Sequence, residues 1–360
     1  MDAKNQIRRG GARSTVDSFI HARNAMMAVL IGIALLCGAV GVNAGSGQNQ
    51  EPAEPDREIP PGSSNAAIER FWTAYHGNDY GAIPAVEEKL QDAIQNDPNN
   101  PTLHALLGAA HFWHIGEASR DANRQDPVLA EDMPEAVMDF GKALDLDYYT
   151  PHFIGHINDD HLPGYLGITT VHLGQRSGDP DLIAKGDQML DFAAYQFPEF
   201  NNFNRWAAHN TDPKDSESYN QALNSLWEGI DNCVGTRIDR THPDLTPYLH
   251  LLTSVGRKKA CWWGGEIAPY SFEGYLLNLG NGLVKAGQIN AAKVIYKDAT
   301  LAANYPTWPY RSALETVAAS DLNARAALYA DADPANDPPL GVPNRGCSYC
   351  HARVPEPGSR

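Results

Sequence analysis

The sequence predicts an all-α fold. Between residues 65 and 329 apolar side chains recur at helical spacing, and no stretch shows a convincing strand pattern. Small and apolar residues also recur in a similar order along pairs of these expected helices, which indicates internal repeats. Proline-rich sequence closes the chain. We therefore expect a helical repeat domain at 65–329, followed by an irregular strap at 330–360.

Residues 1–44 have the pattern of a secretory signal peptide. Five Lys and Arg residues occur in the first 24 positions, and an uncharged stretch from Ala25 to Val42 leads into Val42-Asn43-Ala44. A basic region, an apolar region and a small-residue cleavage site in this order predict export, with cleavage after Ala44. An uncleaved membrane anchor is the alternative, because the uncharged stretch is nearly long enough to span a bilayer.

The segment 45–64 is polar and rich in Pro and Gly, which predicts a disordered spacer. The helical periodicity starts after it. We expect helices at about 65–77 and 82–96, and others between 215 and 256, to complete the stack.

The clearest repeat unit lies near residue 273. Small and apolar residues occupy one face of each of two expected helices there: Leu276, Leu279, Gly280 and Leu283, then Ala292, Tyr296 and Ala299. This pattern resembles the tetratricopeptide repeat, whose two antiparallel helices pack through these positions. The resemblance implies an α-solenoid in which each helix pair covers the apolar side of its neighbour.

Two looser copies of the pattern begin near residues 101 and 160. The first combines Leu107 and Gly108 with Ala136, Phe140 and Ala143, and the second combines Leu166 and Gly167 with Gly186, Leu190 and Ala193. Both contain insertions, and the spacing between copies is not constant. We therefore expect a degenerate tetratricopeptide-like repeat, with insertions that form loops and shape a site.

The strap ends in the most specific motif of the chain. Its prolines (Pro334, Pro338, Pro339 and Pro343) exclude a helix. The pentad Cys347-Ser348-Tyr349-Cys350-His351 follows. This C-x-x-C-H string resembles the haem attachment motif of c-type cytochromes.

That resemblance implies one covalent haem c. Cys347 and Cys350 would form the thioether bonds, and His351 would be the proximal ligand of the iron. A redox-active thiol pair and half of a zinc site are the alternatives. The residues after the pentad supply only Glu356 as a further ligand, which disfavours zinc.

The sixth iron ligand is not evident. In small soluble cytochromes c, a Met well after the pentad completes the iron, but nothing after His351 can ligate iron well here. Eleven His residues between positions 76 and 250 favour a histidine ligand and a low-potential haem. The candidates are His114, His156 and His161.

The distal candidates come from two clusters. His114 ends the string His111-Phe112-Trp113-His114, and the tetratricopeptide resemblance implies that Phe112 and Trp113 line a concave groove suited to a flat macrocycle. The other cluster contains His152, His156, His161, Asp159 and Asp160. A separate divalent metal site is the alternative for this second cluster.

The remaining cysteines suggest a disulfide. Loss of Cys37 with the signal peptide and use of two cysteines for haem leave Cys233 and Cys261. In an oxidising compartment they should pair, and closing a loop of about 28 residues would stabilise the fold by roughly 3 kcal/mol. Two buried free thiols are the alternative.

The net charge limits the partners. The whole chain has 28 basic and 44 acidic residues, and cleavage after Ala44 would bring the net charge from −16 to near −19. Such a body repels nucleic acid and anionic lipid, and no stable membrane insertion is expected after cleavage. A redox partner protein with a basic surface is expected, and a larger assembly is compatible with the repeats.

Three functions fit these observations. The leading hypothesis is an exported mono-haem c-type cytochrome that transfers single electrons, with the helical body as the surface that docks the haem or a partner. The alternatives are a haem enzyme that reduces peroxide or a nitrogen oxide, and a haem-free periplasmic scaffold that binds peptides or proteins. We expect a periplasmic or otherwise exported protein, the cell surface included, and the sequence assigns no catalytic residue.

Overall fold

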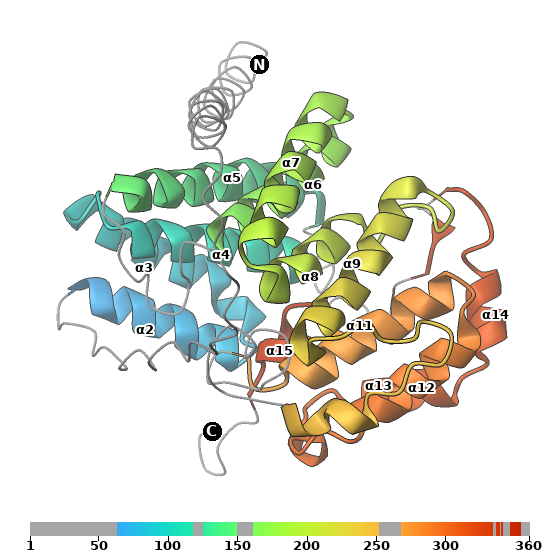
Figure 1. Cartoon of the computed structure of the whole chain (residues 1–360). Coiled ribbons are helices and arrows are strands. Elements are labelled where there is room, and N and C mark those ends of the chain that lie inside the picture. The colour runs from blue at the N-terminus through green and yellow to red at the C-terminus, as the bar shows by residue number, and fades with distance from the viewer. Residues whose placement is uncertain are drawn as a thin grey trace, which may run out of the picture. The chain divides into compact units, whose positions relative to one another are not determined.

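Every regular element of the structure is helical. The computed structural model describes residues 63–117, 125–149, 161–251, 268–333, 336–338, 340 and 346–353. No strand occurs in these ranges, so the all-α prediction is confirmed for them. The α-helices (Figure 1) are α2 (Ser63–His76), α3 (Ile83–Asn96), α4 (Pro101–Glu117), α5 (Gln125–Tyr149), α6 (Leu162–Ser177), α7 (Pro180–Gln196), α8 (Pro198–His209), α9 (Glu217–Val234), α11 (Ser271–Lys285), α12 (Ile289–Ala299), α13 (Arg311–Ala319), α14 (Leu322–Ala327) and α15 (Ser348–His351). Short 3-10 helices are η1 (Tyr80–Ala82), η3 (Thr246–Leu251) and η4 (Tyr305–Thr307).

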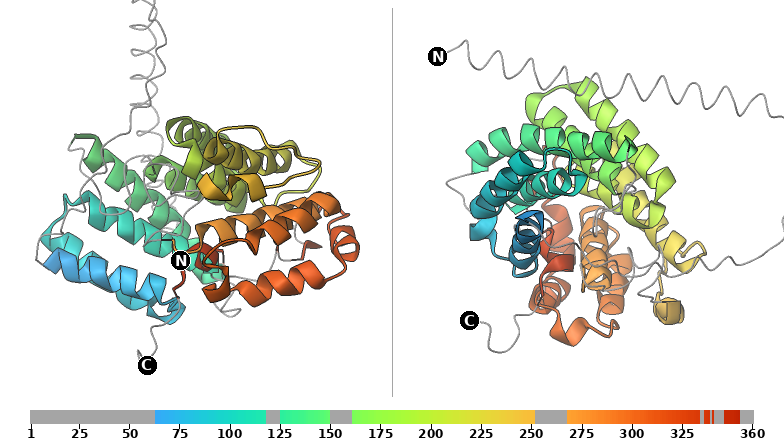
Figure 2. Two further views of the ribbon diagram at one scale, coloured as in Figure 1. Left: turned by 60° about the horizontal axis from the view of Figure 1, so that its bottom comes forward. Right: turned by 90° about the vertical axis from the view of Figure 1, so that its left-hand side faces the viewer.

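Consecutive helices pack side by side as pairs. α2 packs on α3, α4 on α5, α6 on α7, α8 on α9 and α11 on α12, and further contacts join each of the first four pairs to the next. Figure 2 shows this succession from two sides. An amphipathic helix must bury its apolar stripe against another element, and here the neighbouring helices do so.

Three glycines allow helices to approach each other closely within these pairs. A Cβ atom on Gly108 of α4 would lie 2.9 Å from the Phe140 ring on α5, and one on Gly280 of α11 would lie 2.2 Å from the Tyr296 ring on α12. Gly167 of α6 faces Leu190 of α7 in the same way, at 2.8 Å. All three contacts join residues that the sequence pattern matched across a helix pair.

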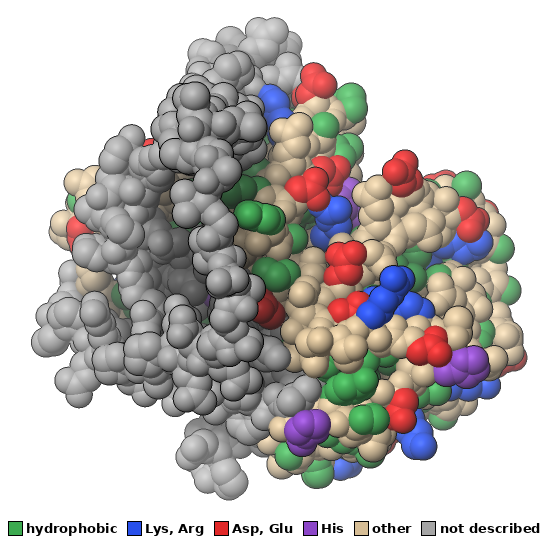
Figure 3. Space-filling model, in the orientation of Figure 1, with side chains coloured by type: hydrophobic (Ala, Val, Ile, Leu, Met, Phe, Trp, Pro, Cys, Tyr) green, Lys and Arg blue, Asp and Glu red, His purple; other side chains and the backbone are tan. Residues whose placement is uncertain are grey.

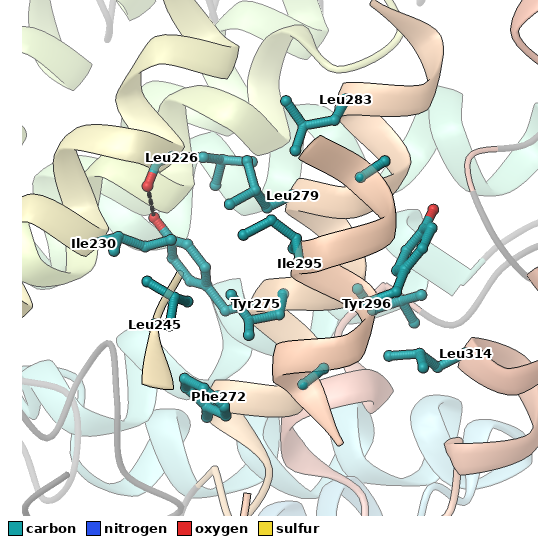
Figure 4. Close-up of a cluster of buried hydrophobic side chains, with 14 of the residues drawn as sticks. Leu226, Ile230, Leu245, Phe272, Tyr275, Leu279, Leu283, Ile295, Tyr296 and Leu314 are labelled. Carbon is teal, nitrogen blue, oxygen red and sulfur yellow. Dashed lines mark hydrogen bonds between the residues drawn. The ribbon is translucent and has the colours of Figure 1, made fainter. Parts of the chain in front are cut away.

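The largest buried cluster lies among α9, α11 and α12. Leu226, Leu279 and Ile295 pack there with aromatic side chains (Figure 4). Tyr275 donates a hydrogen bond to the carbonyl of Leu226 at 2.6 Å, and Tyr296 donates one to Asn281 at 2.7 Å. The hydroxyls of these tyrosines are therefore satisfied inside the core, as buried polar groups need to be.

Local sequence signals set several helix ends. Gly178, with φ 64°, ends α6 in the left-handed region, and Asp179 then caps α7 by accepting hydrogen bonds from the backbone of Asp181 and Leu182. Gly235, with φ 74°, ends α9. Because the chain turns there, residues 235–245 are not helical, which shortens the helical content expected between 215 and 256.

The expected strap is irregular before the pentad where the structure describes it, but the pentad itself contains a short helix, α15 (Ser348–His351). The strap is also attached to the body. Residues 336–338 form no α-helix. Lys285 at the end of α11, with a side chain only 1% exposed, contacts Asp337 at 2.5 Å. A buried ammonium needs such a partner, so this ion pair holds the strap against α11 on its way to the pentad.

Cys233 on α9 is fully buried and disulfide-bonded. The alternative of a buried free thiol therefore does not hold for this residue. Its expected partner, Cys261, lies outside the described residues, so that pairing stays a prediction.

The signal peptide expected at 1–44 also lies outside the described residues, as does the expected spacer up to residue 62. α2 begins at Ser63, slightly earlier than the pattern predicted. Among the described residues no helix is both long enough and apolar enough to cross a membrane.

Candidate functional site

The pentad forms its own short helix against the body. α15 follows directly after Cys347 and lies between α2 and α11, both of which it contacts (Figure 1). The backbone N–H groups of Cys350 and His351 both donate to the carbonyl of Cys347, at 3.4 and 3.3 Å. The two cysteines therefore lie about one helical turn apart, and neither forms a disulfide.

Three hydrogen bonds between the body and the backbone of residues 349–353 hold this turn in place. Tyr270, just before α11, donates its N–H to the carbonyl of Cys350 at 3.0 Å. Arg353 donates its N–H to His76, the last residue of α2, at 2.9 Å. The indole of Trp308 donates to the carbonyl of Tyr349 at 2.8 Å. Segments far apart in the sequence thus fix the pentad from several sides.

Polar side chains add a buried network. The Ser348 hydroxyl lies 2.6 Å from Asn78 Oδ1 and 3.1 Å from Glu117 Oε1. Asn78 also donates from its amide to the Tyr310 hydroxyl at 2.8 Å. Its positive φ of 55° lets the short turn after α2 present its side chain to both partners. The second residue of the motif is therefore bound by the body and does not face solvent.

Cys347 lies among aromatic side chains. Burial, followed by the influence of the Cys347 thiol, raises the pKa of Tyr75 on α2 well above its ordinary value. Burial and the nearby Cys347 also raise the pKa of Tyr165 on α6. On the α4 side, a Cβ atom at Gly116 would lie 3.6 Å from the Cys347 sulfur. Three helices therefore surround this thiol.

Cys350 lies against α11. A Cβ atom at Gly274 would lie only 2.4 Å from the Cys350 sulfur, so only glycine permits this approach. The thiol is surrounded by protein although the residue is partly accessible, and burial, followed by the influence of Cys347 and Glu273, raises its pKa to about 12. The thiol is therefore protonated at neutral pH.

His351 lies beside the aromatic side chains of α2. Its ring centroid is 5.0 Å from that of Tyr75, and Tyr75 in turn packs edge-on against Trp113 of α4 at 5.0 Å. Trp113 is 1% exposed. Trp113 was expected to line a groove, and in the structure it packs on Tyr75, the residue that contacts His351.

The pentad has the donor atoms that a covalent haem c would need. Its two thiols, which are not bonded to each other, would serve thioether attachment, and the adjacent imidazole would serve as an iron ligand. The small residues Gly116 and Gly274 face the two sulfurs, and aromatic rings surround Cys347 and His351. Apolar and aromatic surroundings are what a flat macrocycle requires.

The structure separates the distal candidates. His161 packs edge-on against Phe200, with ring centroids 4.1 Å apart, and precedes Tyr165 by one turn of α6. Tyr165, whose pKa is raised by burial and by Cys347, contacts the same Phe200 ring as His161. His156 lies outside the described residues, as do the other members of its cluster apart from His161.

His114 lies in a different environment. Its Nδ1 is 2.9 Å from Asp132 Oδ2 on α5, and its ring packs against Tyr80. Trp113, the preceding residue, points toward Tyr75 instead. The structure therefore brings His114 together with carboxylates of neighbouring helices and not with the pentad.

Three residues around the pentad were not predicted from the sequence: Glu273, Glu117 and Trp308. Each comes from an element far from the pentad in sequence, and no spacing pattern connects them to it. Glu273 is 2% exposed, and its Oε1 has no hydrogen-bond partner. An unpaired acid inside a helical body is a signal that only burial reveals.

The stability of the folded protein is expected to depend on pH through Glu273. Burial raises the pKa of its carboxyl from an ordinary 4.5 to about 7, and a hydrogen bond from its own backbone opposes this only in part. Since the folded protein holds the proton more tightly than the unfolded chain, its stabilising contribution is complete below pH 4.5 and is lost as pH rises through 7.

We expect Glu273→Gln to remove this pH dependence. The loss corresponds to about 3 kcal/mol of unfolding free energy between acid and mildly alkaline pH. Denaturant unfolding of the full chain at a series of pH values measures it. Glu88→Gln, at an exposed position of α3, is the control and should leave the profile unchanged. Parallel profiles for wild type and Glu273→Gln would contradict the expectation.

Comparison with models of protein families, with curated proteins and with solved structures finds no match to this chain. The functional conclusions therefore rest on its own residues.

Proposed function

We propose that this chain is an exported c-type cytochrome with one covalent haem and that it transfers single electrons. The observation that carries the proposal is how the pentad is bonded and docked on the body. Its thiols are not paired with each other, although Cys233 of the same chain is disulfide-bonded, and its helix is anchored by hydrogen bonds to three segments of the body. A simple redox disulfide would require no adjoining His and no such docking.

In this proposal the chain's own residues hold and shield the group. Cys347 and Cys350 would form the thioether bonds, and His351 would supply a nitrogen ligand to the iron. The haem, once attached, supplies a one-electron iron couple. Tyr75, Trp113 and Tyr165 exclude water from this side of the pentad, and a low-polarity surrounding is one of the protein's means of setting a reduction potential.

We further assign the body to a degenerate tetratricopeptide-like repeat. The close contacts of Gly108 with Phe140, Gly167 with Leu190 and Gly280 with Tyr296 support this assignment, because the same position pair meets in three helix pairs. In this proposal the body has two tasks. It docks the pentad through α2 and α11, and its remaining surface is available to a partner protein.

The partner is a redox protein with a basic surface. The net charge of −16 favours attraction of a positively charged protein and would speed its association at low ionic strength. On the face shown in Figure 3, acidic and basic side chains are interspersed over the described surface. Export to the periplasm or the cell surface would place the chain where covalent haem attachment and disulfides are both formed.

A haem stain on a denaturing gel tests the proposal. The full chain, produced in cells that attach haem c, should give a stained band with one haem per chain and a reducible visible spectrum. The double variant Cys347→Ala, Cys350→Ala should give no stained band, while Ser348→Ala, a control inside the motif, should keep it. An unstained wild-type band would reject the cytochrome and leave the haem-free scaffold as the alternative.

Binding of carbon monoxide distinguishes electron transfer from the alternative haem enzyme. A haem with two histidine ligands has no open position, so the reduced wild-type protein should bind carbon monoxide slowly or not at all. Immediate binding would favour an enzyme that reduces peroxide or a nitrogen oxide.

A further inference from the structure

A second group of chemically active side chains lies away from the pentad, between α3, α4 and α5. His111 and His114 are three residues apart on α4 and therefore share a face of that helix. Glu87 on α3 and Asp132 on α5 reach the same place from the neighbouring helices. Three helices thus bring two imidazoles and two carboxylates together.

The distances within this group are short. His111 Nδ1 lies 2.7 Å from Asp132 Oδ1 and 3.3 Å from Glu87 Oε1. His114 Nδ1 lies 2.9 Å from Asp132 Oδ2 and 3.9 Å from Glu87 Oε1. In a tetrahedral zinc site with bonds of about 2.1 Å, neighbouring ligand atoms are roughly 3.4 Å apart. Asp132 contacts the two histidines through different oxygens, and the four distances lie on both sides of that value. Side-chain shifts that bring one Asp132 oxygen to a common centre would complete such a site.

The same atoms are buried, and two of them lack hydrogen bonds. The exposed side-chain fractions are 7% for His111, 9% for Asp132, 12% for His114 and 16% for Glu87. Glu87 Oε1 and His114 Nδ1 are inaccessible and form no hydrogen bond of acceptable geometry, despite their close approach. The 2.7 Å contact between His111 Nδ1 and Asp132 Oδ1 is a hydrogen bond that a bound ion would replace, whereas Glu87 Oε1 and His114 Nδ1 would gain from the ion the partner that they lack.

A further carboxylate, that of Asp139, lies behind His111. Asp139, two turns after Asp132 on α5, places Oδ2 3.8 Å from His111 Nε2. Its Oδ1 lies 3.3 Å from His104 Nδ1, and His104 Nε2 lies 3.1 Å from the carbonyl of Pro98. A carboxylate behind the second ring nitrogen is the usual support of a metal-binding histidine.

We propose that Glu87, His111, His114 and Asp132 form a binding site for one divalent transition-metal ion of the zinc type. Two neutral imidazoles and two carboxylates balance the charge of such an ion and match its preference for mixed nitrogen and oxygen ligands. Magnesium and calcium prefer oxygen ligands alone, which disfavours them here. The site does not depend on the proposed haem, and it would join three helices through one ion.

Zinc titration of the full chain tests this site. The protein, with its haem attached or, if it carries none, with its thiols alkylated, is freed of metal by a chelator and titrated calorimetrically with Zn²⁺. We expect one ion per chain, a higher melting temperature with zinc, and tetrahedral absorption bands when Co²⁺ replaces it. Asp132→Asn and Glu87→Gln should each lower the zinc affinity at least about 100-fold, and Asp139→Asn about 10- to 100-fold.

A matched control comes from a different His–carboxylate pair. His209 contacts Asp187 at 2.7 Å, outside the proposed site, so Asp187→Asn should leave zinc affinity unchanged. Circular dichroism of the metal-free variants shows that each is folded. The proposal is overturned if folded wild-type protein binds no zinc, or if zinc binds Asp132→Asn and Glu87→Gln as tightly as wild type.

Discussion

Replacing Gly274 by alanine is expected to release the pentad from α11. The added Cβ would lie 2.4 Å from the Cys350 sulfur, 3.0 Å from the Tyr349 carbonyl carbon and 3.1 Å from the Cys350 nitrogen. Two of these three atoms belong to the backbone, which cannot move aside as the end of a flexible side chain can. The same backbone is held by Trp308 and by the amide of Tyr270, so relief of the clash requires loss of these hydrogen bonds.

The size of this effect follows from overpacking. Introducing a methyl group into a close-packed contact costs about 1–3 kcal/mol. A loss of 1–2 kcal/mol in local stability raises the population of the opened segment by about 5- to 30-fold. In the full chain prepared without haem, alkylation of Cys350 should accelerate by a similar factor, because the buried thiol reacts through the opened state. Mass spectrometry of the modified peptide follows this rate.

Gly116→Ala is the matched control. It also lies opposite a pentad cysteine, but its Cβ would lie 3.6 Å from the Cys347 sulfur, which is an ordinary van der Waals contact. We therefore expect little change in the alkylation of either cysteine in Gly116→Ala. If Gly274→Ala left the Cys350 rate at the wild-type value, the pentad could not be docked on α11 as the structure shows.

The helix pairs could be predicted from the sequence because their contacts are local. Gly280 and Tyr296 belong to consecutive helices, so the spacing of small and large residues along the chain already indicates which side chains meet. The donor atoms of the pentad can be named from the sequence for the same reason, while the haem that they would hold stays a prediction. Its two thiols and its imidazole lie within five consecutive residues, and one helical turn brings the thiols together.

The surroundings of the pentad could not be predicted in this way. Ser348 contacts Asn78 and Glu117 across separations of 270 and 231 residues, and Trp308 comes from a third segment. Such contacts depend on how the successive helices stack, which no local periodicity specifies. His114 illustrates the same limit: the sequence placed it on a helix, but only the positions of α3 and α5 show that it faces Glu87 and Asp132.

These positions make His161 the best distal candidate in the proposed cytochrome. It precedes Tyr165 by one helical turn, and residues four apart on a helix share a face. Tyr165 stacks on Phe140 with ring centroids 5.4 Å apart and also packs edge-on against Phe200, the residue that contacts His161. Burial and Cys347 raise the pKa of Tyr165, so the aromatic cluster that contains His161 includes a residue within electrostatic reach of the attachment motif.

Replacing His161 by alanine is therefore expected to open the iron in the haem-loaded protein. With two histidine ligands the iron is low-spin and has no vacant position, and removal of one leaves a high-spin iron that binds carbon monoxide immediately on reduction. Visible spectra and electron paramagnetic resonance of the oxidised protein measure the change. His114→Ala should keep the wild-type spectrum, because that side chain contacts Asp132, and should weaken only zinc binding. A low-spin spectrum retained in His161→Ala would show that another residue completes the iron, whereas the same high-spin spectrum in wild type and variant would show that no histidine of the body does.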